Sequence, residues 1–291
     1  MSVGALGTNT PIVLAGCMLF GALAGAVGTF VLARRRALVA DVAGHAALPG
    51  VALGFLVGEA LGFGGRTPWV LLLGGALTAL AAACCVPVLA RQRRIGSDGA
   101  TAIALAGFFG VGAVLLSHVQ SHGAGSQGGL RSLLFGSAAA TSREDVFALV
   151  AMSCVALGLL ATTFKGLALV AFDEEFARIA GLPVRALDFF MTFLLVATVV
   201  AGMQLAGVVL VVAMVVTPAA AARVIGGRLP FVTLLSATIG AVTAAAGVLA
   251  SRLGDNVPTG AAMTLAATTV FVLLLLFTAL PRAGAARSAR A

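Results

Sequence analysis

Hydrophobic residues run along this chain in long blocks separated by short polar segments, a pattern typical of membrane-spanning helices. A helix needs about 20 apolar residues to cross the hydrocarbon core of a bilayer. The block between Leu187 and Arg223 is too long for one crossing, and Gly202, Gln204 and Gly207 indicate where it divides. The sequence therefore predicts spans at 11–33, 37–61, 69–90, 99–118, 145–163, 187–203, 205–223, 230–250 and 259–280.

The distribution of Lys and Arg favours nine spans over eight. With nine spans and the N-terminus outside, the inner segments hold 14 of the 18 basic residues: Arg34, Arg35, Arg36, Arg91, Arg93, Arg94, Lys165, Arg178, Arg185, Arg223, Arg228, Arg282, Arg287 and Arg290. Positive charge is usually retained on the cytoplasmic side. Eight spans would place the basic tail 282–291 outside. A re-entrant segment near Gln204 also satisfies the pattern, so both arrangements stay open.

Composition excludes a soluble protein. The 291 residues are 60% apolar and 10% charged, with a mean hydropathy of +1.12, whereas soluble domains carry about 25% charged residues. In such a chain the net charge of +8 reflects loop placement and not nucleic-acid binding. The expected fold class is all-α: a polytopic helical bundle of eight or nine spans, forming one multi-pass domain over 1–291 in the plasma membrane.

One segment inside the second predicted span is unusually polar, with Asp41 and His45 four positions apart. That spacing places both side chains on one face of a helix. An Asp near the centre of a membrane helix costs about 2.5–3.5 kcal/mol on insertion scales, so ionisable residues there are usually functional. Carboxylate and imidazole bind divalent cations. The following Leu48-Pro49-Gly50 is expected to weaken the helix and expose carbonyls. We predict a metal-ion path here.

Two further histidines, His118 and His122, are also four apart, at the outer end of the fourth span. They are candidates for receiving a metal ion, or else solvated residues at a loop edge. The four cysteines lie in apolar runs without a CxxC spacing, which argues against a metal cluster or disulfide framework.

The inner segment 164–186 has the signals of a short helix. Asp173 can cap its N-terminus, acidic residues including Glu174 follow, Gly181 stops it, and Pro183 prevents its continuation. We expect Phe172 and Phe176 to share an apolar face bordered by Arg178 and the acids.

The sequence gives no sign of an enzyme. It has no Walker A motif and no large soluble domain, so any ATP hydrolysis would be performed by another chain. An intramembrane metalloprotease would need a glutamate base beside a zinc-binding histidine, and no Glu adjoins any histidine here.

Four stretches together resemble a known family, the membrane permease subunits of bacterial ABC transporters that import zinc, manganese or iron(II). They are Arg35-Arg36-Ala37-Leu38 through Asp41, His45 and Leu48-Pro49-Gly50; Leu133-Leu134-Phe135-Gly136; Lys165-Gly166 through Phe172-Asp173 and Phe176-Ala177 to Gly181-Leu182-Pro183; and Gly207 through Thr217-Pro218 to Ala222-Arg223. Two positions depart from the family pattern: Gly44 replaces a frequent serine, and one extra residue separates Asp255 from its proline.

The resemblance implies a fold related to the vitamin B12 and siderophore importers. It implies a homodimer of permeases, a cytoplasmic ATPase dimer, and an external metal-binding protein as partners. Asp41 and His45, with His118 and His122, are then candidate metal ligands. Residues of the segment 164–186, namely Phe172, Asp173, Glu174, Phe176, Arg178, Gly181 and Pro183, would couple the permease to the ATPase.

The transported ion would be Zn²⁺ or Mn²⁺, with Fe²⁺ a third candidate, and no cofactor would be permanently bound. Asp and His donors suit all three ions. Two other transport functions stay open: a siderophore- or cobalamin-type chelate permease, and a secondary metal transporter, which usually has several intramembrane acids.

Overall fold

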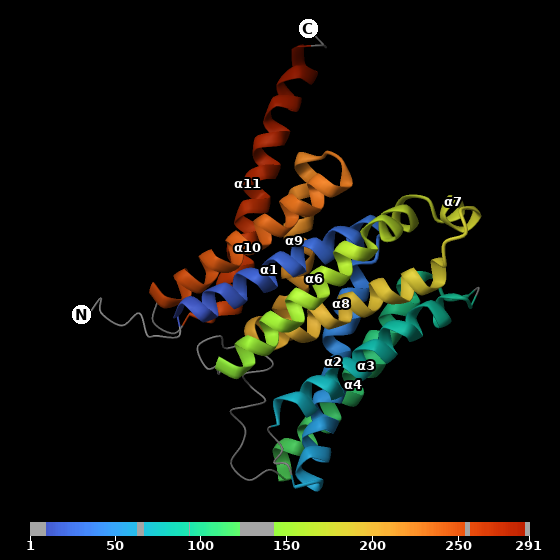
Figure 1. Cartoon of the computed structure of the whole chain (residues 1–291), viewed down its shortest axis with the longest axis vertical. Coiled ribbons are helices and arrows are strands. Elements are labelled where there is room, and N and C mark those ends of the chain that lie inside the picture. Colours follow the sequence, from blue (N-terminus) through green and yellow to red (C-terminus); the bar gives the residue numbers. More distant parts are fainter. Residues whose placement is uncertain (1–9, 63–66, 93, 123–142, 254–256, 289–291) are drawn as a thin grey trace.

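The computed structural model describes residues 10–62, 67–92, 94–122, 143–253 and 257–288, and these form an all-helical chain (Figure 1). Its helices are α1 (Thr10–Ala33), α2 (Ala37–Ala60), α3 (Pro68–Ala90), α4 (Ser97–His122), α6 (Arg143–Phe172), α7 (Glu174–Ile179), α8 (Val184–Ala206), α9 (Val208–Ile225), α10 (Leu229–Leu253) and α11 (Thr259–Ser288). The external stretch 133–136 lies outside the described residues.

Eight of these helices are long and apolar enough to cross a membrane, and α9 supplies a shorter apolar stretch, Leu210–Ile225. The division between α8 and α9 falls at Gly207, whose positive φ of 83° suits glycine because it has no Cβ. Near the far end of α9, Arg223 Nη1 donates to the Leu32 carbonyl at the end of α1, at 3.2 Å. Thus α9 runs back across the bundle to the end at which α8 begins, as the nine-span path requires.

The other long helices lie close to where the hydrophobic pattern predicts them, but α6 and α11 are longer than expected. Helix α11 runs on beyond the predicted end at 280 to Ser288, into the segment expected to be a basic tail. Helix α6 continues for nine residues beyond the predicted end at 163, to Phe172. The segment predicted to lie between spans, 164–186, therefore begins in helix, although Lys165 interrupts its apolar run. Lys and Gly do not end a helix by themselves when the neighbouring residues favour one, and here Ala, Leu and Val follow.

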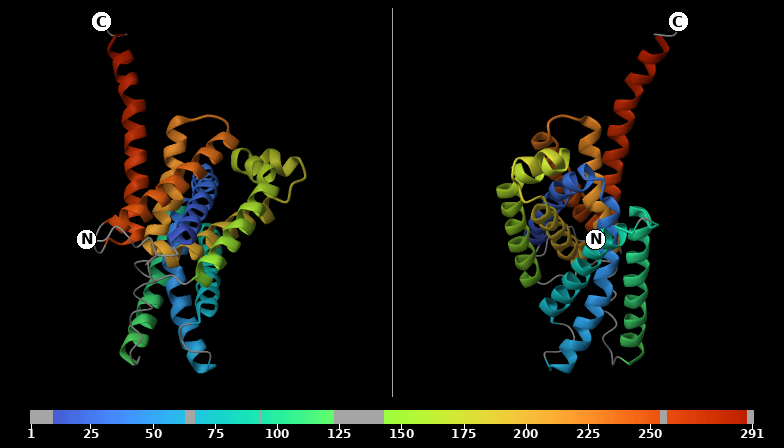
Figure 2. Two further views of the ribbon diagram at one scale, coloured as in Figure 1. Left: turned by 60° about the vertical axis from the view of Figure 1, so that its left-hand side comes forward. Right: turned by 90° about the vertical axis from the view of Figure 1, so that its right-hand side faces the viewer.

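The bundle consists of two groups of helices (Figures 1 and 2). In one group α2 packs against α3 and α4; in the other α1 packs against α9, α10 and α6, with α11 against α9 and α10. Helix α8 contacts members of both groups. Helices α1 and α2 are the most enclosed candidate spans, and Phe20, Leu23 and Phe30 of α1 are fully buried.

Glycines let α1 and α10 come into backbone contact. A Cβ on Gly21 would overlap the carbonyl oxygen of Gly240, and a Cβ on Gly25 would overlap that of Ser236. The Ser236 hydroxyl donates to the Gly25 carbonyl at 2.7 Å. Close approach of this kind is what holds helices together in lipid, where apolar contact between helices competes with equally apolar lipid tails.

Helix α2 passes through Pro49 without a break, contrary to the expected weakening at 48–50. Two neighbouring helices support it there: Gly50 lies against the backbone of Gly74 in α3, and the Pro49 ring lies beside Gly112 of α4. Proline is tolerated inside membrane helices when neighbouring helices brace the chain.

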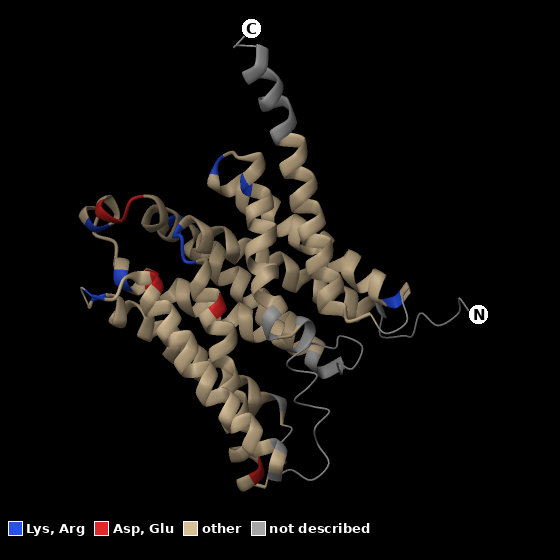
Figure 3. Cartoon of the chain, turned by 180° about the vertical axis from the view of Figure 1, so that it is seen from behind, with Lys and Arg blue, Asp and Glu red and all other residues tan. Residues whose placement is uncertain are grey.

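Lys and Arg gather mainly on the side of the bundle that carries α7 and the turn between α9 and α10 (Figure 3). This is the side that the positive-inside tendency assigns to the cytoplasm.

The contact between α1 and α10 makes a stability prediction. Gly21→Ala should destabilise the chain by about 1–3 kcal/mol, because the added methyl overfills a packed contact. The measurement is the thermal midpoint of the detergent-purified protein, and the matched control is Gly158→Ala, where a Cβ would have no neighbour within 4 Å. Equal midpoints for the two variants would contradict this account of the packing.

Candidate metal site and coupling helix

Asp41 and His45 lie on one face of α2, as their spacing predicts. His45 Nε2 lies 3.5 Å from Asp41 Oδ1. A good hydrogen bond would be shorter, 2.7–3.2 Å for N–H···O. The two side chains therefore point the same way without forming a close hydrogen bond. A cation between them could be coordinated by both.

His45 is oriented by α4. Its ring meets Phe109 edge-on, with centroids 5.2 Å apart and planes at 86°. Its Nδ1 is buried and has no hydrogen-bond partner among the described residues. A buried nitrogen left unpaired costs about 1–3 kcal/mol, so such atoms are rare in folded proteins. The nitrogen that faces Asp41, and any ion between the two side chains, is Nε2.

The Asp41–His45 pair lies at the edge of the buried face of α2, where the helix becomes exposed. The side chain of His45 is 23% exposed and that of Asp41 is 42% exposed, whereas the adjoining Ala40, Val42, Ala43 and Ala46 are fully buried. Polar side chains in a membrane helix face the bundle interior or a water-filled cavity, not lipid. Asp41 therefore opens toward a polar path or toward another protein surface.

His118 does not join this pair. His118 is exposed on α4, nine residues beyond Phe109, which corresponds to about 13 Å along the helix axis. His122 is the last residue of α4, and the structure describes its backbone but not its side chain. In the described part of the chain, no three His, Cys, Asp or Glu side chains come together.

The short helix α7 follows the capping signals in the sequence. Asp173 Oδ1 accepts a hydrogen bond from the Phe176 backbone N–H at 2.8 Å, so it is the N-cap. Glu174 and Glu175 lie in the first turn, favourable against the positive end of the helix dipole. Gly181 has a φ of +80°, which suits it to the end of a helix, and Pro183 precedes α8.

Large apolar side chains are exposed on α7 and at the end of α6. Phe172, Phe176 and Ile179 are 68%, 55% and 80% exposed, while Ala177 is buried against the bundle. Ile179 is a third exposed apolar residue near the two phenylalanines, which the sequence predicts to share a face. The rim is charged: Arg178 Nη2 lies 3.1 Å from Glu174 Oε1.

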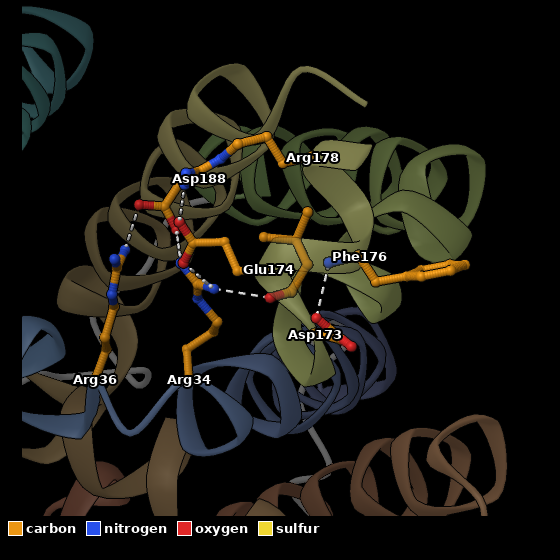
Figure 4. A network of polar contacts seen from close by, with 8 residues as sticks. Arg34, Arg36, Asp173, Glu174, Phe176, Arg178 and Asp188 are labelled. Carbon is orange, nitrogen blue, oxygen red and sulfur yellow. Dashed lines mark hydrogen bonds and ion pairs between the residues drawn. The ribbon is translucent and has the colours of Figure 1, made fainter. Parts of the chain in front are cut away.

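A network of ion pairs joins α7 to the rest of the chain, and sequence reasoning did not find it (Figure 4). Arg34 reaches Glu174 at 3.3 Å and Asp188 at 2.7 Å, and Arg36 reaches Asp188 at 2.8 Å. The available signal was an acid, Asp188, at the inner edge of the predicted span 187–203.

A model of the ABC 3 transport family matches residues 9–278. The chain belongs to this family. As a member of the ABC 3 transport family with eight candidate spans, it is a multi-pass membrane permease and not an ATPase. Membership decides against the secondary transporter and the metalloprotease.

Similar proteins carry metal-transport names. The chain is 40% identical over 268 residues to the manganese transport system membrane protein MntC of Bacillus subtilis, covering 92% of this chain and 60% of that relative. It is 34% identical over 265 residues to the zinc transport system membrane protein TroC of Treponema pallidum, covering 91% of this chain and 87% of the relative.

Solved structures agree with the fold. The structure of PsaBC from Streptococcus pneumoniae in complex with Fab matches with a TM-score of 0.79 and 31% identity, over 92% of this chain and 91% of that chain. An inward-facing structure described as a metal-chelate type ABC transporter matches with a TM-score of 0.65 over 95% of this chain and 91% of that one. At 17% identity the second shows the fold alone. The expected relation to chelate importers is confirmed at that level.

The capping of α7 makes a local prediction. Asp173→Ala should destabilise the first turn of α7 by about 1 kcal/mol, because the Phe176 N–H loses its acceptor, whereas Asp173→Asn should preserve the cap. Hydrogen–deuterium exchange of 174–179 should rise in the first variant only. Equal exchange in both variants would show that the side chain does not hold the helix.

Proposed function

We propose that the chain is the permease of an importer for a divalent transition metal, manganese or zinc, and that Asp41 and His45 are the donors the ion meets inside the membrane. The observation that carries this proposal is the pair itself: a carboxylate and an imidazole aligned within a candidate span, with His45 Nε2 facing Asp41 Oδ1. Ionisable side chains within membrane spans usually line ion or substrate pathways.

The donor set suits either metal. An ionised Asp gives a hard oxygen and a neutral His gives a borderline nitrogen, a combination that accommodates Mn²⁺, Zn²⁺ and Fe²⁺. Thiolates would favour zinc or copper(I), but these three cysteines are not placed at the pair. Cys17 of α1 is buried in the hydrophobic core, and Cys84 and Cys85 line a separate apolar cavity of about 790 Å³. The names of the relatives include both manganese and zinc, with manganese in more of them.

Two donors are too few for these ions. Zinc takes four ligands, and manganese takes more. A second copy of the chain would supply another Asp41 and His45, and the 42% exposed Asp41 is suitably open for this. The permease would thus work as a homodimer with the ion between the two copies of α2.

His118 and His122 would act in an earlier step. At the outer end of α4 they could receive the ion from an external metal-binding protein and release it toward Asp41. Reception of the ion by His118 and His122 and its later binding by His45 both require neutral imidazole. Protons therefore compete with the metal at both places.

The coupling segment 164–186 would connect the permease to the ATPase that drives transport. The exposed Phe172, Phe176 and Ile179 form an apolar face with a charged rim, the type of surface that fits a groove on a partner. A cytoplasmic ATPase dimer would bind there. ATP-driven closure of that dimer would displace α7 and switch the side to which the path opens.

A chelate permease is the second candidate, favoured only by the shared fold. A bulky chelate surrounds its own metal with ligands, so a bare Asp–His pair would add nothing to its recognition. A rise in a free divalent ion inside cells separates the two functions.

The metal site predicts a loss of transport. In cells expressing the permease with its ATPase and binding protein, one divalent metal should accumulate, and His45→Ala or Asp41→Asn should abolish the accumulation because a ligand is lost. Elemental analysis of washed cells measures the effect. Glu59→Gln is the matched control, since it removes an exposed acid from the same helix.

Two outcomes would contradict this proposal. Normal accumulation in both variants would remove Asp41 and His45 from the ion path. No accumulation of any divalent metal in cells with an assembled wild-type complex would favour the chelate permease.

The docking face predicts a loss of assembly. Replacing Phe172 and Phe176 together by Ser should release the ATPase during affinity purification, because the apolar contact is lost while the helix cap remains. Phe231→Ser is the control, another exposed phenylalanine, at the start of α10. An unchanged complex in the double variant would move the docking site elsewhere.

A further inference from the structure

The turn between α1 and α2 is only three residues long, Arg34–Arg36, and has a fixed geometry. The Arg36 N–H bonds to the Val31 carbonyl at 2.9 Å and the Arg35 N–H to the Leu32 carbonyl at 3.1 Å. These two bonds close a Schellman motif. Its left-handed position, normally taken by glycine, is occupied by Arg35 with a φ of 54°. Arg36 is at once the last residue of the turn and the N-cap of α2.

Arg34 is mostly buried, and its guanidinium joins three other segments. Its side chain is 11% exposed. Nη1 donates to the Val170 carbonyl near the end of α6 at 2.8 Å and to Glu174 Oε2 of α7 at 3.3 Å. Nη2 donates to Asp188 Oδ1 of α8 at 2.7 Å. The planar guanidinium can hold several acceptors in a fixed arrangement, so this contact is directional.

Asp188 completes the connection to α2. Its two carboxylate oxygens are divided between two arginines, Oδ1 accepting from Arg34 and Oδ2 lying 2.8 Å from Arg36. The start of α2 is therefore held to α8 through one carboxylate, and Figure 4 shows these arginines reaching it from the same side.

The network places the docking helix close to the metal pair. Asp41 follows Arg36 by five residues, about 7.5 Å along α2. Between Glu174 and the first turn of α2 stand only Arg34, Asp188 and Arg36, each in contact with the next. Because the intervening turn has three residues with fixed hydrogen bonds, little displacement can be absorbed there.

We infer that Arg34 and Asp188 are positioning residues that transmit the movement of α7 to α2, and so link ATP hydrolysis to the ion path. The inference rests on the proposed function, in which α7 binds the ATPase and α2 carries the metal ligands. A purely structural network would instead affect only the amount of folded protein.

The test uses the complete complex of permease, ATPase and binding protein in proteoliposomes. The expected result for Arg34→Gln is an assembled complex that still hydrolyses ATP but moves at least five-fold fewer Mn²⁺ or Zn²⁺ ions per ATP. Arg34→Lys should partly restore the ratio, since it keeps a cation beside Asp188. Arg91→Gln is the control, an exposed arginine at the end of α3.

A second readout does not depend on transport. Hydrogen–deuterium exchange of the first two turns of α2 should change when ATP is added to the wild-type complex, and this change should be absent in Arg34→Gln. If Arg34→Gln fails to assemble, Asp188→Asn serves instead, because Asp188 lies on α8 outside the docking face and its loss of charge weakens the contacts to both Arg34 and Arg36.

The two readouts separate the possible failures. Wild-type proteoliposomes that move no metal would contradict the proposed function, while the exchange experiment would still test the network. An unchanged ratio of ions to ATP in assembled Arg34→Gln, an equal exchange response in variant and wild type, or no exchange response in the wild type would each overturn the inference.

Discussion

Lipid gives two helices little reason to associate, because its acyl tails are as apolar as the side chains that the helices would bury. This constraint determines the rest of the structure. Helices α1 and α10 adhere where Gly21 and Gly25 admit a neighbouring backbone, and α2 and α3 do so at Gly50 and Gly74. With the backbones in contact, helix positions are defined closely enough to hold an Asp and a His beside one another and open to the surface.

The same constraint explains where the charged groups lie. Inside the span, polar groups are few, and the Asp41–His45 pair is supported by buried alanines on either side. At the end of the bundle, where water is available to the chain, arginines and acids can be arranged as a network instead. The proposed metal site and the proposed mechanical connection thus lie on the same helix, within about two turns of each other.

Much of this could be predicted from sequence because the relevant physics is local. The helix positions follow from runs of apolar residues, and the adjacency of Asp41 and His45 follows from the helical repeat. Asp173 and Gly181 indicate where α7 begins and ends. The failures are non-local. Pro49 keeps its helix only because α3 and α4 brace it, and no local pattern reveals that Arg34 would meet Asp188, 154 positions away.

The three-residue turn between α1 and α2 also bears on how this chain can evolve. One residue inserted there would rotate α2 by about 100° relative to α1, since a helical turn contains 3.6 residues. Asp41 and His45 would then face a different neighbour although neither had changed. Substitutions can accumulate along α1 and α2 one at a time, but a change of length in this turn alters the whole helix at once. Sequence change in this region is therefore confined to substitutions. The length of the turn, which sets the rotation of α2 relative to α1, has to be kept as a whole.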